Sequence, residues 1–252
     1  MTTALKGHGA TLVDDDPERI VAAGGDGTVG EAAALAARLG VPLAVVPTGT
    51  ANDFARATEL PQDFDEATEL AATGARTSSL ELGYANGRPF VNAVAVGLSP
   101  DAARRAEPLK GVLGPLAYPL GAAIAALRDP AVRCRVRADG RTLFDGEAWQ
   151  VIVAATGAFG GGSSIDVAHS GDGRLDIVVV PARRRVTLLR MAVALRKGDI
   201  AVWGGSDHVR ADAVSLEVPE GTLCNLDGER VDLGERVQLS AECDAFALVT
   251  GP

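Results

Sequence analysis

The sequence predicts an α/β fold in two parts, an N-terminal parallel α/β domain followed by a C-terminal, mostly antiparallel β domain. Up to about residue 80, short apolar strands alternate with helix-forming segments, which is the pattern of a parallel sheet. Beyond that point, β-type runs are separated by turns rich in glycine, aspartate and proline. We therefore expect two domains, over residues 1–79 and 80–252.

The N-terminal part alternates its two kinds of element in a regular order. Strands are expected at 20–23, 41–46 and 77–82, and helices at 30–39 and 63–72. The first helix is rich in alanine and is followed by Gly40, which is a typical residue just past a helix end. Asn52 is expected to cap a short helix that contains Phe54 and Arg56.

The C-terminal part has strand-like runs with two helical interruptions. Strands are expected at 90–96, 132–138, 148–155, 175–180, 214–218 and 237–239, and helices at 116–127 and 186–196. This order predicts a sheet built mainly from hairpins and longer antiparallel connections.

The composition is that of a folded, soluble chain. Hydrophobic residues make up 47% and charged residues 23%, which is enough for a packed core. The net charge of −9 argues against nucleic acid as a partner, since binding its backbone needs a basic face. The longest uncharged stretch, 111–127, is shorter than the roughly 20 residues that span a bilayer. We expect a cytoplasmic protein that is at most peripheral to the inner face of the membrane.

The segment 21–28 reads VAAGGDGT, an apolar strand that enters a glycine turn just before a helix. Glycines let backbone N–H groups approach an anion, and the N-terminus of the following helix adds a partial positive charge. The Asp26 carboxylate can hold a magnesium ion on bound phosphates, and Thr28 supplies a hydroxyl. An ordinary strand–helix turn also needs glycines, but the full string directly after an apolar strand favours a phosphate-binding loop.

A second element, PTGTANDFAR at 47–56, follows the next strand. It is therefore expected at the same edge of the sheet, where ligands of open α/β folds bind. Thr50 could bond a phosphate oxygen, while Asn52 and Asp53 could hold the loop or orient metal-bound water. Taken alone, this element is explained by a helix cap with a salt bridge to Arg56. Its position beside GGDGT favours the phosphate site.

GGDGT followed by PTGTANDFAR resembles the diacylglycerol kinase catalytic-domain family, which includes sphingosine kinases and bacterial lipid kinases. NAD kinases and phosphofructokinases share the glycine loop but not the NDFAR element. Further similarities lie in an F-x-N strand at 90–98, a glycine run at 159–162, a D-G-x-L-D turn at 172–176 and a D-G-E motif at 227–229. Together the matches cover about residues 19 to 250.

The resemblance implies an ATP-dependent kinase that phosphorylates a hydroxyl of diacylglycerol or a similar lipid, with ATP and Mg²⁺ as cofactors. The implied nucleotide-binding residues are Gly24, Gly25, Asp26, Gly27, Thr28, Val29, Gly30, Glu31, Thr50, Asn52 and Asp53. Asp227 is implied as the proton acceptor, and Glu229 as a residue that binds metal or positions Asp227. A plain Asp-Gly hairpin turn is the alternative explanation of this motif.

The D-G-x-L-D turn has a different implied role. In bacterial members of the family it holds a structural magnesium ion away from the reaction. Mapped here, that site comprises the Asp172 carboxylate with the backbone carbonyls of His169 and Arg174. A hairpin turn without metal explains the same residues.

Two stretches are candidates for transient contact with the membrane surface and the lipid. The apolar stretch 113–127 matches a family helix beside the interdomain cleft, although core packing explains it as well. The second is a basic cluster, Arg183, Arg184, Arg185, Arg190, Arg196 and Lys197. It could face anionic lipid, or it could be a solvated helix face.

The sequence departs from the family pattern before the first strand. Only residues 1–19 precede that strand, with no Asn-Pro motif, and Gly30 stands where the family commonly has asparagine. A missing strand would leave an unpaired sheet edge and an open pocket wall, so weak ATP binding and either a homodimer or poor solubility are expected. The missing strand suggests one alternative to an active lipid kinase, a catalytically weak nucleotide- or lipid-binding remnant. A second, weaker alternative is an enzyme similar to NAD kinase, against which the NDFAR element and the D-G-E turn argue.

Overall fold

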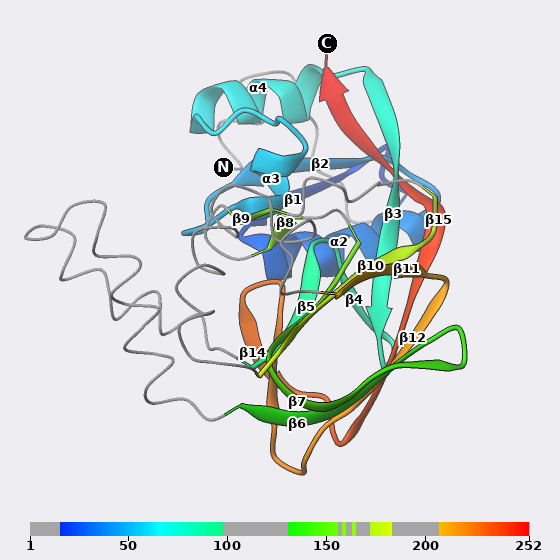
Figure 1. The fold of residues 1–252 in the computed structure, drawn as a ribbon. Helices are drawn as coiled ribbons and strands as arrows, with labels where there is room; N and C mark the ends of the chain where they lie inside the picture. Colours follow the sequence, from blue (N-terminus) through cyan, green and yellow to red (C-terminus); the bar gives the residue numbers. More distant parts are fainter. Residues whose placement is uncertain are drawn as a thin grey trace, which may run out of the picture.

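The computed structural model describes residues 16–97, 131–155, 158–159, 163–164, 172–182 and 207–251 (Figure 1). Its strands form one 13-stranded sheet and a separate pair, β8 (Ala158–Phe159) with β9 (Ser163–Ser164). The predicted helices at 116–127 and 186–196, the glycines at 160–162, His169, the apolar stretch and the basic cluster lie outside the described residues. No helix within the described ranges is both long and apolar enough to cross a membrane.

The N-terminal part forms one edge of the 13-stranded sheet, where its first two strands are parallel and helices cover both faces. Its elements are β1 (Ile20–Gly24), α2 (Asp26–Leu39), β2 (Leu43–Pro47), α3 (Asp53–Ala57) and α4 (Phe64–Thr73). β1 and β2 pair in parallel. Every residue of β2 is buried, which is the pattern of a strand covered on both sides.

The alternation of side chains along β2 explains the two layers. Leu43 and Val45 belong to the hydrophobic cluster that includes Ala33 and Ala36 of α2. Ala44 and Val46 belong to the cluster of Ala67 and Ala71 of α4. Since successive side chains of a strand point to opposite faces, α2 and α4 cover opposite faces of the sheet.

The C-terminal part is mostly antiparallel, as predicted. Its remaining strands are β3 (Arg76–Ala85), β4 (Arg88–Phe90), β5 (Ala93–Gly97), β6 (Val132–Ala138), β7 (Arg141–Ala154), β10 (Leu175–Pro181), β11 (Asp207–Ala211), β12 (Ala213–Glu217), β13 (Leu223–Leu226), β14 (Glu229–Asp232) and β15 (Arg236–Gly251). β7 pairs antiparallel with β5, β6 and β10. The hydrophobic core between these strands is distinct from the two clusters of the N-terminal part.

The two parts are joined through the long strands β3 and β15, which run side by side through the molecule (Figure 1). At its end, β15 also pairs with β2, in parallel, at Leu248 and Leu43. The predicted boundary between residues 79 and 80 falls inside β3. The predicted strand at 237–239 was much too short, because the register of β15 shifts between Glu242 and Phe246 and a charged segment interrupts the apolar pattern.

Candidate functional site

The first turn of α2 follows the first of the two glycine-containing loops. The helix begins at Asp26, four residues earlier than predicted, because Gly25 is extended and already serves as its N-cap. As a glycine, the N-cap residue has no side chain with which to cap this end. The first amides of a helix have no acceptor within it and carry a partial positive charge, so this end favours an anion such as phosphate.

The two glycine-containing loops are in direct contact. Thr48 N–H donates to the carbonyl of Gly24 at 3.0 Å. A Cβ atom on Gly49 would lie 2.5 Å from the Cα of Gly25, so only glycine fits there. The sequence elements GGDGT and PTGTANDFAR therefore meet at one edge of the sheet, as predicted from their positions after parallel strands.

Asn52 closes the second loop and does not cap α3 with its side chain. Its Oδ1 accepts the N–H of Gly49 at 2.8 Å, and its backbone is left-handed with φ of 50°. Asparagine tolerates that conformation better than most residues. Asn52 occupies the predicted N-cap position of α3, but its side chain bonds Gly49 and shapes the loop instead of capping the helix.

The Asp26 carboxylate points into the protein. It accepts the backbone N–H groups of Asp53 at 3.1 Å and Phe54 at 2.8 Å. It also accepts the side-chain amide of Asn92 at 3.1 Å, and the residue is only 8% exposed. These bonds fasten the start of α3 to the start of α2, so Asp26 holds the two loops together.

Asp227 lies in the turn between β13 and β14 and is 7% exposed. Its carboxylate accepts the backbone N–H groups of Val91 at 2.7 Å, Asn92 at 2.9 Å and Ala93 at 3.0 Å. Burial raises the pKa of Asp227 to about 7, against the effect of those donors and with a smaller contribution from the charge of Asp26. Asp227 thus ionises near neutral pH.

Glu229, two residues further on, is exposed and lies over the first turn of α2. Its Oε1 is 2.7 Å from the point where a Cβ on Gly27 would be. The Asp227 carboxylate packs beside the same helix, with Oδ2 3.5 Å from the Cβ position of Gly30. The D-G-E motif therefore sits directly against the glycine loop, although some 200 residues separate them in the chain.

The other implied nucleotide-binding residues differ in how far they are exposed to solvent. Val29 and Gly30 are buried within α2, whereas Thr28, Glu31 and Thr50 are exposed. Two residues that the implied set omits contribute directly to the site: Gly49, through its contact with Gly25, and Asn92, through its bond to Asp26. The F-x-N motif was the available signal for Asn92.

The turn at Asp172 is held by arginine. Asp172 accepts the N–H of Arg174 at 3.1 Å and pairs with the guanidinium of Arg210. Burial opposes ionisation of Asp172, but the Arg210 hydrogen bond and the Arg174 N–H outweigh it and lower the pKa. Arg210 also lies 3.6 Å from the buried carboxylate of Asp176, which bonds His208 at 2.7 Å.

These contacts bear on the structural magnesium that the resemblance implies. A metal ion at this turn would share the Asp172 oxygens with Arg210 and the Arg174 amide. Within the described part of the chain, no group of three or more His, Cys, Asp or Glu side chains is arranged to hold a metal. His169, one of the three implied ligands, lies outside the described residues, and the Asp172 carboxylate here accepts from the Arg210 guanidinium and the Arg174 N–H, so the magnesium site stays a prediction.

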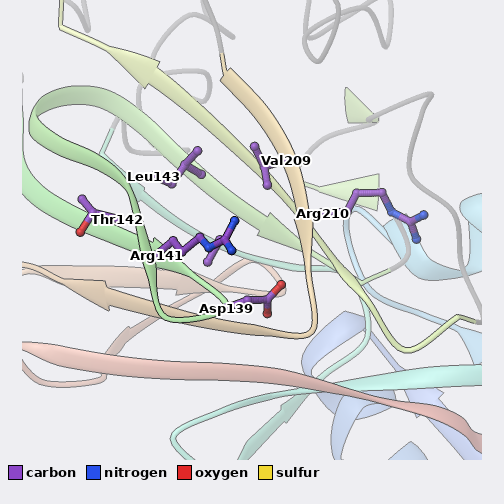
Figure 2. Close-up of a pocket in the computed structure, with 7 residues that line it drawn as sticks. Asp139, Arg141, Thr142, Leu143, Val209 and Arg210 are labelled. Carbon is purple, nitrogen blue, oxygen red and sulfur yellow. The ribbon is translucent and has the colours of Figure 1, made fainter.

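A cavity of about 460 Å³ lies on the C-terminal sheet, apart from the loops just described. It is lined by Ala138, Asp139, Arg141, Thr142, Leu143, Val209 and Arg210. Figure 2 shows that the Arg210 side chain extends away from the other lining residues. None of the implied catalytic or nucleotide-binding residues lines this cavity, so we do not place the reaction there.

Comparison with known proteins covers almost the whole chain. Residues 2–84 match the family model described as diacylglycerol kinase catalytic domain, and residues 92–246 match the YegS C-terminal NAD kinase beta sandwich-like domain. The chain is 32% identical to "Diacylglycerol kinase" of Bacillus subtilis over 83% of its own length and 70% of that protein. It is 36% identical to "Probable lipid kinase YegS-like" of Pseudomonas syringae, over 90% of its length and 74% of that protein.

A solved structure supports the same relationship. The crystal structure of a diacylglycerol kinase from Bacillus anthracis superposes with a TM-score of 0.71 and 26% identity. The match covers 93% of this chain and 78% of the other. The predicted architecture, a parallel α/β part followed by a β-sandwich-like part, is thereby confirmed.

Proposed function

The chain belongs to the diacylglycerol kinase catalytic domain family and has the YegS-type C-terminal domain, and from this premise we propose that it is an ATP-dependent lipid kinase. It would transfer the γ-phosphoryl group of ATP to the hydroxyl of diacylglycerol or a similar lipid. Its relatives named as diacylglycerol kinases support this substrate class.

One juxtaposition carries the proposal: the exposed Glu229 carboxylate lies over Gly27, in the uncapped first turn of α2. Phosphates bound at that helix end would place the terminal phosphoryl group beside a carboxylate. Phosphoryl transfer through a loose transition state needs mainly positioning, charge stabilisation and a group that orients the attacking hydroxyl. The site offers the first two through the amides of α2 and the third through the D-G-E turn.

The two acidic residues of this turn differ in what their carboxylates contact. A general base must come within hydrogen-bond reach of the proton that it accepts. Glu229 is exposed beside the loop, whereas the Asp227 oxygens already accept N–H groups of residues 91–93. We therefore assign proton acceptance to Glu229. Asp227, to which the resemblance gives that role, would hold the turn in place.

The cofactor assignment follows from the same contacts. Bound Mg²⁺ neutralises charge on the phosphates, usually keeps several waters and takes few protein ligands. The Asp26 carboxylate, which bonds the start of α3, is not a direct ligand in this geometry. The ion would be held by the ATP phosphates and water, with the exposed Thr28 hydroxyl as the oxygen that the loop itself offers.

The test is a transfer assay with γ-labelled ATP and Mg²⁺ on purified protein. Three kinds of acceptor would be offered in separate reactions: diacylglycerol in mixed micelles, other hydroxyl-bearing lipids in mixed micelles, and NAD in solution. We expect label in a lipid phosphate, and a loss of about 10²-fold or more in kcat for Glu229→Gln. Label in NAD alone would instead support the NAD kinase-like alternative, and Mg-ATP binding without transfer would support the non-catalytic remnant.

A further inference from the structure

Asn92 touches both carboxylates around which the site is built. Its side-chain amide donates to Asp26 Oδ1 at 3.1 Å. Its backbone N–H donates to Asp227 Oδ1 at 2.9 Å. The residue is 2% exposed, so both bonds are shielded from water.

These two carboxylates belong to elements that are otherwise distant in the chain. Asp26 starts α2 and is fastened to the start of α3, whereas Asp227 lies in the turn after β13. Asn92 occupies the short link between β4 and β5. Its own carbonyl accepts the N–H of Ala155 at 2.9 Å, which fixes its backbone to the C-terminal sheet.

We propose that Asn92 is a positioning residue for phosphoryl transfer: it sets the placement of the glycine loop relative to the D-G-E turn. The inference rests on the proposed function, because the turn and the loop are the two halves of the reaction site. Asn92 ties Asp26, at the start of α2, to the link between β4 and β5, whose backbone N–H groups also hold the Asp227 carboxylate. A displacement of about 1 Å between such groups can cost about 10²-fold in rate.

Asparagine suits this role because it offers a neutral donor. The Asp26 carboxylate needs an N–H or O–H group at this position, and an alanine would supply none. An aspartate has the same shape but would place a second negative charge beside Asp26. Like charges this close cannot both stay ionised, so one carboxyl would keep its proton to a higher pH.

The first test compares Asn92→Ala with Asn86→Ala. Asn86 is a matched control, since its side chain also makes several hydrogen bonds, to Leu233 O, Arg236 O and Gln238 N, but contacts neither loop. Both variants should melt at lower temperature than the wild type. Assayed where both are folded, only Asn92→Ala should lose kcat, by about 10²-fold, and bind a non-hydrolysable Mg-ATP analogue more weakly in calorimetry.

The second test uses Asn92→Asp across pH. The titratable groups that face this position are Asp26 on α2 and Asp227 after β13. Asp53 lies nearby at the start of α3, where its backbone N–H donates to the Asp26 carboxylate. When the new carboxyl is protonated, it can donate a hydrogen bond to Asp26 as asparagine does. When it is ionised, its negative charge repels the Asp26 carboxylate. The kcat of the variant relative to wild type should therefore be highest at acid pH and fall as pH rises.

The outcomes separate this inference from the proposed function. A wild type that phosphorylates no lipid removes the function itself, and the inference with it. A wild type that does so while folded Asn92→Ala keeps kcat and analogue affinity within about threefold overturns the inference alone. So does an Asn92→Asp variant whose kcat relative to wild type is the same at every pH, because a merely structural asparagine would give that result.

Discussion

Gly49 lies so close to Gly25 that a Cβ atom added to it would be 2.5 Å from the Gly25 Cα and 3.1 Å from the Gly25 nitrogen. Both obstacles are backbone atoms, so they cannot swing aside as a flexible side chain would. We expect Gly49→Ala to separate the two loops and to raise the KM for ATP by about tenfold or more, as expected for misplaced binding groups. Steady-state kinetics with varied ATP measures this effect.

Gly221→Ala is the control for a glycine replacement as such. Gly221 has φ of 72°, but nothing lies within 4 Å of a Cβ atom placed there. This variant should lose about 1 kcal/mol of stability from its backbone conformation and keep its KM for ATP. Equal KM values for Gly49→Ala and wild type would show that the contact between the loops does not shape the ATP site.

Asp26→Ala should destabilise the fold as well as reduce ATP binding. The substitution removes the acceptor of Asp53 N–H, Phe54 N–H and the Asn92 amide, and each buried group left unpaired costs about 1–3 kcal/mol. Thermal melting and calorimetric ATP titration should both change. A variant that loses transfer activity but melts like the wild type would show that Asp26 acts on the metal ion directly and is not mainly a structural residue.

Asp63→Ala is a matched comparison on the same domain. The Asp63 side chain also accepts two backbone N–H groups, those of Asp65 and Glu66, at the start of α4. Because this is an exposed helix cap, its loss should cost about 0.5–2 kcal/mol. Its ATP affinity should remain that of the wild type, in contrast to Asp26→Ala.

Asp227→Asn should be destabilising, and more so at acid than at neutral pH. An amide nitrogen in place of Oδ2 would face the N–H of Val91, whereas the hydroxyl oxygen of a protonated carboxyl can still accept that bond. The folded-state pKa of about 7 lies above the unfolded value of 3.8, so Asp227 contributes stability that is present below pH 4 and lost as pH rises through 7. The asparagine has no such titration.

The measurement is urea unfolding of both proteins at pH 4.5 and pH 8. The stability advantage of wild type over Asp227→Asn should shrink between these two values. The many other carboxylates also change the stability with pH, but they are the same in both proteins, so their effect cancels in the difference between the two unfolding free energies. An advantage that stays constant or grows with pH would mean that the Asp227 carboxyl is ionised throughout.

The sequence predicted those elements whose pattern is local. The strand at Val132–Ala138 was predicted with its observed bounds, because buried Cys134 and Val136 alternate with exposed arginines. The two phosphate-site loops were also predicted together, since both follow parallel strands and must share one edge of the sheet. Such inferences need only neighbouring residues and a general rule of topology.

What the sequence did not predict depends on contacts between distant segments. The bonds of Asn92 join it to residues 66 and 135 positions away, and nothing in a local pattern selects these partners. The inward direction of the Asp26 carboxylate likewise depends on amides that arrive with α3. In β15, a charged segment interrupts the apolar pattern, so the sequence did not predict the second half of this strand, which pairs with β2 at Leu248.

Arg210 holds the D-G-x-L-D turn through the carboxylate of Asp172. Arg210→Met keeps the length of the side chain but leaves the fully buried Asp176 and the half-exposed Asp172 without its charge. Because Arg210 and Asp172 are partly exposed, losing the bonds to these charged groups should cost about 1.5–3 kcal/mol, so the melting temperature should fall by several degrees. Because Arg210 supplies the positive charge, we expect EDTA to leave the melting temperature of the wild type unchanged.

Arg174→Met separates this effect from the loss of any nearby arginine. The Arg174 side chain bonds the largely exposed Asp212 and the carbonyl of Arg210, so its replacement should cost less than about 1 kcal/mol. Elemental analysis of the wild type completes the experiment. One equivalent of tightly bound magnesium, or a wild type that melts several degrees lower in EDTA, would show that the turn holds a metal ion beside Arg210, and the guanidinium would then be only a neighbour of that site.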